Sequence, residues 1–301
     1  MKKNVHTLDL NFQGIPKTIA SYLIPHPQGG ILVESGPGST IPELERELAK
    51  FGYSLTDITD VLLTHIHLDH AGASGWLARQ GANIYVHEIG APHMLAPERL
   101  IISATRIYGE MMDTLWGEFL PVPEEKLTIL SGDGEIEIQG LTFRYLDTPG
   151  HAFHHMSYII EDICFSGDVG GVRLPGPDFL RLPTPPPDFH IESWRKSIAK
   201  LKGENFSHIA PTHFGIFENA HQHLEMLEET LNDVEKWIDA TLPSVQKPET
   251  LRDGFAEWEY ARCSEAGLDQ ETLHSYSLAM PLGMGADGLW RYWTKFKMAE
   301  G

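Results

Sequence analysis

The chain has 301 residues, and 42% of them are hydrophobic, which is enough for a substantial core in one large domain or in one domain with an appendage. The formal net charge of −19 disfavours a nucleic-acid substrate, because phosphate binding draws on clustered Lys and Arg. The chain carries no apolar run long enough to cross a bilayer and no export signal at its start, so we expect no membrane partner and a cytoplasmic location.

The chain begins with segments typical of β-strands. Residues 7–12, 18–24 and 31–34 are rich in β-branched and apolar side chains and indicate hairpin strands. Residues 40–50 combine a capping residue, acids in the first turns and apolar side chains on one side, and they predict a short amphipathic helix. These elements lead into another predicted strand, at residues 58–64.

Four potential metal ligands directly follow the predicted strand at residues 58–64. They are His65, His67, Asp69 and His70, in the six-residue sequence HIHLDH. The carboxyl end of such a strand enters a loop at the rim of the sheet, where the backbone can curl around an ion. Imidazole and carboxylate ligands suit zinc, with iron or manganese as alternatives. The stretch therefore predicts a metal site, and the competing interpretation is a solvated polar loop.

Two helical regions follow the metal-binding stretch. Residues 71–80 predict a helix whose small side chains either let it approach the metal site closely or serve tight packing. Residues 90–125 are insertion-like, with apolar side chains at helical intervals, and predict one or two helices. Their aromatic and Met side chains favour a place in the core, and a substrate pocket is the alternative.

Three further candidate ligands lie later in the chain, each where a short predicted strand meets a Gly- or Pro-containing turn. The strands are predicted at residues 141–146, 156–165 and 207–210, and the ligands are His151, Asp168 and His213. Cysteine ligands are not expected, because the two cysteines lack partners, and Cys164 is expected to pack inside its strand. The seven candidates together suffice for two metals.

The order of these residues resembles the metallo-β-lactamase superfamily of binuclear hydrolases. That family's pattern is a His-x-His-x-Asp-His box, a His in a Thr-Pro-Gly-His turn, a bridging Asp and a late His, and the resemblance covers roughly residues 5–240. It implies an α/β fold, a four-layer αβ/βα sandwich, of the general glyoxalase II-like type. We expect a catalytic domain over residues 1–242, with the helical insertion, and a helical extension over residues 243–301 packed on it.

The resemblance also implies a role for each candidate ligand. The first metal would be held by His65, His67 and His151, the second by Asp69, His70 and His213, and Asp168 would bridge the two. We expect two zinc ions, with iron or manganese as alternatives, and a metal-bridging hydroxide that attacks an ester, thioester, lactone or phosphoester of a small molecule. Asp69 is also expected to orient that hydroxide and to move a proton.

The resemblance leaves other activities open. A mononuclear iron oxidoreductase of the sulfur dioxygenase type would show bound iron and oxygen uptake. A nuclease of the same superfamily is disfavoured by the acidic composition, and a scaffold without catalysis would bind no metal. The chain also departs from the family pattern, since Glu34 and Ser35 stand where many members carry an Asp-containing turn. We therefore expect Glu34 to support the loop and assign it no catalytic role.

The loop at residues 170–188 is rich in Gly and Pro and follows the predicted bridging Asp168. Arg173 and Arg181 in this loop are candidates for binding an anionic part of the substrate, because a guanidinium can grip a carboxylate or phosphate with two hydrogen bonds. Structural salt bridges are the alternative for both side chains.

Helices are predicted for the rest of the chain. Residues 218–242 favour a helix on which His221 and His223 point to different faces, and both are expected to be exposed. Residues 251–263 and 272–296 predict further helices with many aromatic side chains. These could cover the catalytic half or pair with another subunit, so we expect a monomer or a homodimer. The remaining histidines are expected to have structural roles.

Overall fold

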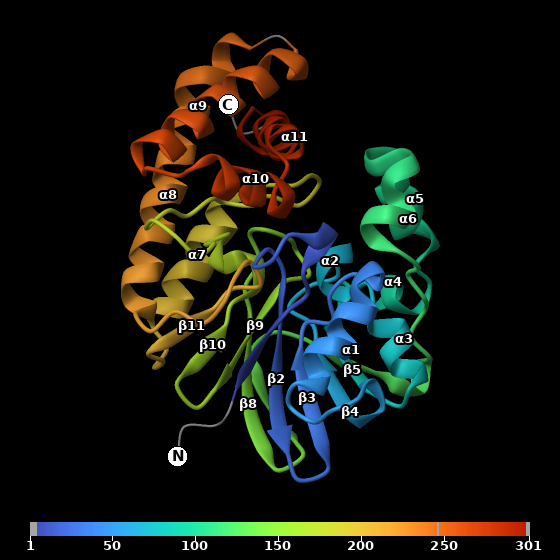
Figure 1. Ribbon diagram of the computed structural model, residues 1–301. Coiled ribbons are helices and arrows are strands. Elements are labelled where there is room, and N and C mark those ends of the chain that lie inside the picture. Colours follow the sequence, from blue (N-terminus) through green and yellow to red (C-terminus); the bar gives the residue numbers. More distant parts are fainter. Residues whose placement is uncertain (1–4, 246, 299–301) are drawn as a thin grey trace. The chain divides into compact units, whose positions relative to one another are not determined.

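The computed structural model describes residues 5–245 and 247–298, which fall into two compact units (Figure 1). The first unit holds the chain as far as Asp147 together with His154–Phe165, and the second holds Thr148–Phe153 and the chain from Ser166 onward. This division runs through the predicted catalytic domain, and the boundary expected after residue 242 stays a prediction. Residues 1–3, on which the expectation about export partly rests, lie outside the described residues.

A six-stranded mixed sheet forms one layer of the first unit. Its strands follow chain order, with β1 to β3 antiparallel and β3 to β6 parallel. Their bounds are β1 (His6–Asp9), β2 (Ala20–His26), β3 (Gly29–Val33), β4 (Ile58–Leu62), β5 (Asn83–His87) and β6 (Leu127–Leu130). The strands predicted at the start of the chain and before residues 65–70, here called the ligand box, are therefore confirmed.

Four antiparallel strands of a second sheet also belong to the first unit. They are β7 (Gly134–Ile138), β8 (Leu141–Asp147), β9 (Met156–Ile160) and β10 (Ile163–Phe165). The single strand predicted over residues 156–165 is wrong, because Glu161 has a φ of 53° and turns the chain between β9 and β10. Tyr158 of β9 donates a hydrogen bond to the carbonyl of Leu63 at 3.0 Å, which ties this sheet to the end of β4.

Helices of the first unit share a hydrophobic core with the first sheet. Their bounds are α1 (Ile41–Ala49), α2 (Leu68–Ala71), α3 (Ser74–Arg79), α4 (Ala91–Leu95), α5 (Glu98–Tyr108) and α6 (Met112–Trp116). Leu44 of α1 and Leu77 of α3 share a core with Leu32 and Val61 of the strands. The helix predicted over residues 71–80 is confirmed as α3, which begins at Ser74, and the separate short helix α2 includes Asp69 and His70 of the ligand box.

The small side chains near α3 serve tight packing. A Cβ atom on Gly75 would lie 2.0 Å from the carbonyl oxygen of Leu120, and one on Gly72 would lie 2.8 Å from the backbone nitrogen of Gly38. Side chains larger than hydrogen would force the backbone of these segments apart. This favours the packing interpretation of the small residues.

The predicted insertion is helical as expected, but it forms three helices, α4, α5 and α6, rather than one or two. Trp116 is buried and stacks on Phe12, with the ring centroids 5.4 Å apart, while Ile102, Ile107 and Met111 are exposed. One side of the insertion therefore belongs to the core, and the other side faces outward.

The second unit is mainly helical. Its elements are β11 (His208–Ala210), α7 (Ile191–Lys202), α8 (Ala220–Thr241), α9 (Pro248–Glu265), α10 (Gln270–Ala279) and α11 (Leu282–Tyr292). The helical region predicted over residues 272–296 is confirmed as α10 and α11, which are separated at Pro281, a residue without a backbone N–H. Across the described ranges, no helix is both long and apolar enough to span a membrane.

Candidate metal centre

The first two histidines of the ligand box converge on one point in the first unit. The chain leaves β4 at Leu62, and the ring nitrogens His65 Nε2 and His67 Nδ1 lie 2.9 Å apart. Two nitrogens bound to one tetrahedral zinc at about 2.0–2.1 Å are separated by roughly 3.3 Å, so the spacing fits two ligands of one ion after a small adjustment.

The third histidine of the box, His70, is held by Glu34, which directly follows β3. His70 Nδ1 donates to Glu34 Oε1 at 2.9 Å, and the same carboxylate accepts hydrogen bonds from the backbone and the hydroxyl of Thr64. Both side chains are buried. With Nδ1 engaged, Nε2 is the ring atom of His70 that could bind a metal, and it lies 3.6 Å from Asp69 Oδ2. The expected supporting role of Glu34 thus extends to orienting a candidate ligand.

A change of Glu34 to glutamine tests that orientation. The amide keeps the size of the side chain but removes the negative charge that faces His70, so we expect metal affinity to fall by about 10- to 100-fold. Titration of the metal-depleted protein with zinc measures the effect. Glu45→Gln, on the exposed side of α1, is the control and should bind as the unmodified chain does. Equal affinities for all three proteins would contradict the assigned role of Glu34.

Two more histidines stand beside the box in the first unit. The ring of His155 lies 5.2 Å from the ring of His65, and that of His154 lies 6.0 Å away, both nearly parallel to it. His154 Nδ1 also accepts a hydrogen bond from the backbone of Ile66 at 3.4 Å. These histidines hold the loop of the box, which agrees with the structural role expected for them.

The helical insertion contributes Tyr108 near the box. Tyr108 ends α5 and meets Trp116 edge to face, with centroids 5.1 Å apart. Burial and the nearby charge of Asp69 raise the pKa of its phenol, so the hydroxyl keeps its proton at neutral pH. A neutral hydrogen-bond donor of the insertion therefore lies in the neighbourhood of Asp69.

The second unit brings the other three candidate ligands together around one carboxylate. Asp168 lies in a 3-10 helix, Gly167–Gly170, and is buried. Its Oδ2 is 3.5 Å from His151 Nε2, and its Oδ1 is 3.5 Å from His213 Nε2. His151 Nδ1 bonds the carbonyl of Pro183 at 2.9 Å, which leaves Nε2 as the atom that faces Asp168. One carboxylate oxygen thus lies beside each imidazole.

Trp194 of α7 contacts the turns that carry two of these candidate ligands, His151 and Asp168. Its indole N–H donates to the carbonyl of Val169 at 2.8 Å. Its Cα would lie 2.4 Å from a Cβ atom on Gly150, whose φ of 146° also disfavours any other residue. The glycine of the Thr-Pro-Gly-His turn is therefore required for close packing on α7.

His223 is buried, so its expected exposure is wrong, while His221 is exposed as expected. His223 Nε2 bonds the carbonyl of Gly170 at 2.8 Å, and Arg173 Nη1 lies 3.3 Å from its Nδ1. Burial lowers the pKa of His223 to about 4, so its ring is neutral at pH 7. The helical periodicity alone could not indicate that this face of α8 meets the loop after Asp168.

The lowered pKa of His223 predicts a loss of stability in mild acid. Between pH 6.5, the ordinary pKa of histidine, and about pH 4, its pKa in the folded chain, the unfolded chain binds a proton at this histidine and the folded chain does not. The free energy of unfolding of metal-free protein should therefore fall as the pH drops from 6.5 to 4. In urea titrations, this fall in the free energy of unfolding should be smaller for His223→Gln than for the unmodified chain, and the difference should be at most about 3 kcal/mol. Identical pH profiles for the two proteins would contradict the prediction.

Both arginines predicted to bind substrate make internal ion pairs. Arg181 is fully buried, and its Nε donates to Glu259 of α9 at 2.9 Å. Arg173 Nη2 bonds Asp178 at 2.7 Å. The geometry of Arg181 fits a structural salt bridge, which was the alternative to substrate binding. A substrate contact of Arg173 stays a prediction.

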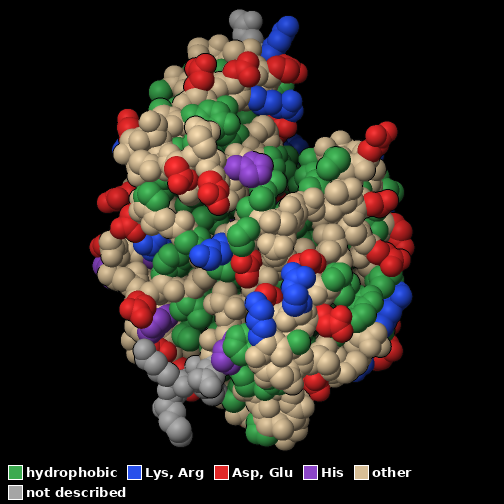
Figure 2. Space-filling model, in the orientation of Figure 1, with side chains coloured by type: hydrophobic (Ala, Val, Ile, Leu, Met, Phe, Trp, Pro, Cys, Tyr) green, Lys and Arg blue, Asp and Glu red, His purple; other side chains and the backbone are tan. Residues whose placement is uncertain are grey.

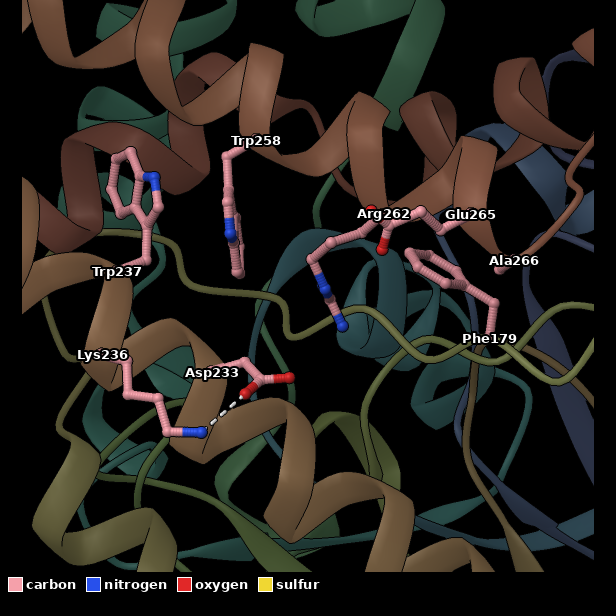
Figure 3. A pocket seen from close by; sticks show the side chains of 8 residues that line it. All are labelled: Phe179, Asp233, Lys236, Trp237, Trp258, Arg262, Glu265 and Ala266. Carbon is pink, nitrogen blue, oxygen red and sulfur yellow. Dashed lines mark hydrogen bonds and ion pairs between the residues drawn. The ribbon is translucent and has the colours of Figure 1, made fainter.

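A pocket with a volume of about 610 Å³ forms a concave surface on the second unit, between α8, α9 and the loop at Phe179 (Figure 3). Trp237 and Trp258 supply aromatic faces, and two basic and two acidic side chains balance one another along it. None of the seven candidate ligands lines this surface. The candidate ligands therefore lie outside this pocket, four of them in the first unit and three in the second.

A family model described as the metallo-beta-lactamase superfamily matches residues 14–213. An archaeal metallo-beta-lactamase fold-containing protein of Sulfurisphaera tokodaii is 26% identical over 216 residues, which are 68% of this chain and 78% of that protein. Its crystal structure aligns with a TM-score of 0.66 at 19% identity, covering 96% of this chain and 99% of the other. This likeness shows the same α/β fold.

Two relatives with named activities match shorter parts of the chain. A hydroxyacylglutathione hydrolase of Rhodopseudomonas palustris is 30% identical over 150 residues, which are 49% of this chain and 46% of that enzyme. An atrochrysone carboxyl ACP thioesterase of Aspergillus fumigatus is 25% identical over 194 residues, which are 63% of this chain and 49% of that enzyme. The matches thus span about half the length of each enzyme.

Proposed function

Because the chain belongs to the metallo-β-lactamase superfamily, we propose that it is a metal-dependent hydrolase with a two-metal site, acting on an ester or thioester of a small acyl compound. The observation that carries the proposal is the environment of Asp168, whose two oxygens each lie 3.5 Å from a different imidazole. A carboxylate in this position is suited to bridge two cations.

We propose a role for each candidate ligand of the two units. The first metal would be held by His65, His67 and His151, the second by Asp69, His70 and His213, with Asp168 shared. The donor set is neutral imidazole and carboxylate without thiolate, which suits two zinc ions, with iron or manganese as alternatives. Support comes from the convergence of the His65 and His67 nitrogens in one unit and of the two imidazoles on Asp168 in the other.

When bound, the metals would supply a water of lowered pKa and would polarise the scissile carbonyl. Side chains of the protein would orient the water, transfer the proton and donate a hydrogen bond to the substrate. Asp69 would orient that water and pass a proton to the leaving group, because its carboxylate is next to the ligand atom of His70. Glu34 would fix the ring of His70, and the un-ionised phenol of Tyr108 would donate a hydrogen bond toward the substrate.

The choice of an acyl substrate is supported by composition and by the relatives. The two relatives with named activities are a hydroxyacylglutathione hydrolase and an acyl carrier protein thioesterase. The net charge of −19, with acidic side chains spread over the face in Figure 2, would repel polyanions such as nucleic acids.

A substrate panel tests the proposal. Zinc-loaded protein should hydrolyse a small thioester or ester faster than a lactone, a phosphodiester or a β-lactam, and the metal content should approach two equivalents. Protein loaded with iron and supplied with a persulfide serves as the test for the oxidoreductase alternative. Oxygen uptake there without hydrolysis of any ester would replace the proposed activity.

A further inference from the structure

We infer that His223 and Arg173 are positioning residues that fix Asp168 and His213 relative to each other within the second unit. This inference rests on the proposed function, since it concerns two of the proposed ligands. Neither side chain is in the family's ligand pattern, and both act through the segment between Gly170 and Arg173.

The first contact is made at the end of the 3-10 helix that carries Asp168. That helix closes on itself, with the backbone N–H of Gly171 donating to the carbonyl of Asp168 at 3.0 Å. The carbonyl of Gly170, two residues after Asp168, receives the Nε2–H of His223 at 2.8 Å. His223 comes from the first turns of α8, so this bond anchors the turn of Asp168 to a 22-residue helix.

The second contact joins the same segment to His213. The backbone N–H of Arg173 donates to the carbonyl of His213 at 2.6 Å, and Phe214 donates back to the carbonyl of Arg173 at 3.1 Å. The segment therefore has Asp168 at one end and is hydrogen-bonded to the His213 loop at the other. A shift of this segment would change the distance between the two proposed ligands.

The two side chains lock this segment by bonding each other. Arg173 Nη1 donates to His223 Nδ1 at 3.3 Å, and its guanidinium lies 4.2 Å above the ring of Phe217. His223 must therefore be neutral with its proton on Nε2, so that it accepts from Arg173 and donates to Gly170 at once. Leucine can do neither, whereas the amide of glutamine can place a donor near the position of Nε2.

Three variants test the inference, with metal binding as the readout. Metal-depleted wild type, His223→Leu, His223→Gln and His221→Leu are titrated with Co²⁺, and affinity, stoichiometry and the visible spectrum are recorded. We expect His223→Leu to lower the affinity for Co²⁺ by about 10-fold or more and to change the Co²⁺ spectrum. Effects of this size are usual when a residue that orients metal ligands is removed. His223→Gln should recover most of both. His221→Leu changes an exposed histidine of the same helix and should match the wild type.

Arg173→Met provides a second route if His223→Leu fails to fold. Methionine keeps an apolar contact with Phe217 but cannot donate to His223, so the same change in the Co²⁺ spectrum is expected. Wild-type spectra and affinities in both His223→Leu and Arg173→Met would overturn the inference while leaving the proposed function intact. A wild-type protein that binds no Co²⁺ would overturn both.

Discussion

Replacing Asp168 with alanine is expected to remove most of the bound metal and to lower hydrolysis by at least about a thousandfold. The carboxylate is buried and stands between His151 and His213, one oxygen beside each ring. Its loss would leave two imidazoles without the carboxylate that they face. The two proposed cations would also lose the negative charge that offsets their mutual repulsion. Metal analysis of the purified variant and its rate on the best substrate of the panel measure both effects.

The matched control for Asp168→Ala is Asp233→Ala, which removes an exposed carboxylate on α8. That variant should keep full metal content and activity. A melting temperature measured for each metal-free protein separates loss of the ligand from loss of the fold. Full metal retention and activity in a folded Asp168→Ala protein would contradict the bridging role and the proposed two-metal site.

The ligand box could be recognised from sequence because its signals are local. An apolar β-branched run predicts β4, and the polar ligands begin where that run ends. The later candidates share this arrangement, since His151, Asp168 and His213 each stand in a turn that contains Gly or Pro. Residue type and order are enough for such a pattern, and the architecture follows from the family resemblance.

The role of Glu34 depends on strand pairing, which the local sequence does not contain. Val33 and Leu62 are partners in the parallel pair of β3 and β4, so the residues that follow them leave the sheet side by side. This register places Glu34 next to Thr64 and within reach of His70. A single sequence shows Glu34 only as an acid after a strand.

Burial of His223 was missed for a similar reason. Helical spacing shows which residues share a face of α8, but it does not show which segment packs there. Here that segment is the loop after Asp168, whose carbonyl at Gly170 requires a donor. The hairpin of β9 and β10 and the break between α10 and α11 were likewise missed, because short apolar runs do not show where the chain turns back.

Replacing Glu259 with glutamine is expected to destabilise the second unit by about 3–5 kcal/mol. Glu259 is buried and accepts from Arg181 at 2.9 Å and from Arg262 at 2.7 Å, so one carboxylate serves two guanidinium groups. Glutamine can replace a hydrogen bond but not the charge, and the fully buried Arg181 would then lack its counter-ion. Urea unfolding of the metal-free protein measures the loss.

Arg252 and Asp287 provide the control for this ion-pair prediction. They form a bidentate pair of 2.7–2.8 Å, but both side chains are substantially exposed. Asp287→Asn should therefore cost about 1 kcal/mol or less, because water solvates both groups when the pair is broken. If Glu259→Gln costs no more than Asp287→Asn, the buried pair does not hold the loop of Arg181 against α9. If Glu259→Gln costs several-fold more than Asp287→Asn, the ion pair with α9 fixes the loop that follows Asp168. Removal of the C-terminal helices should then also weaken metal binding.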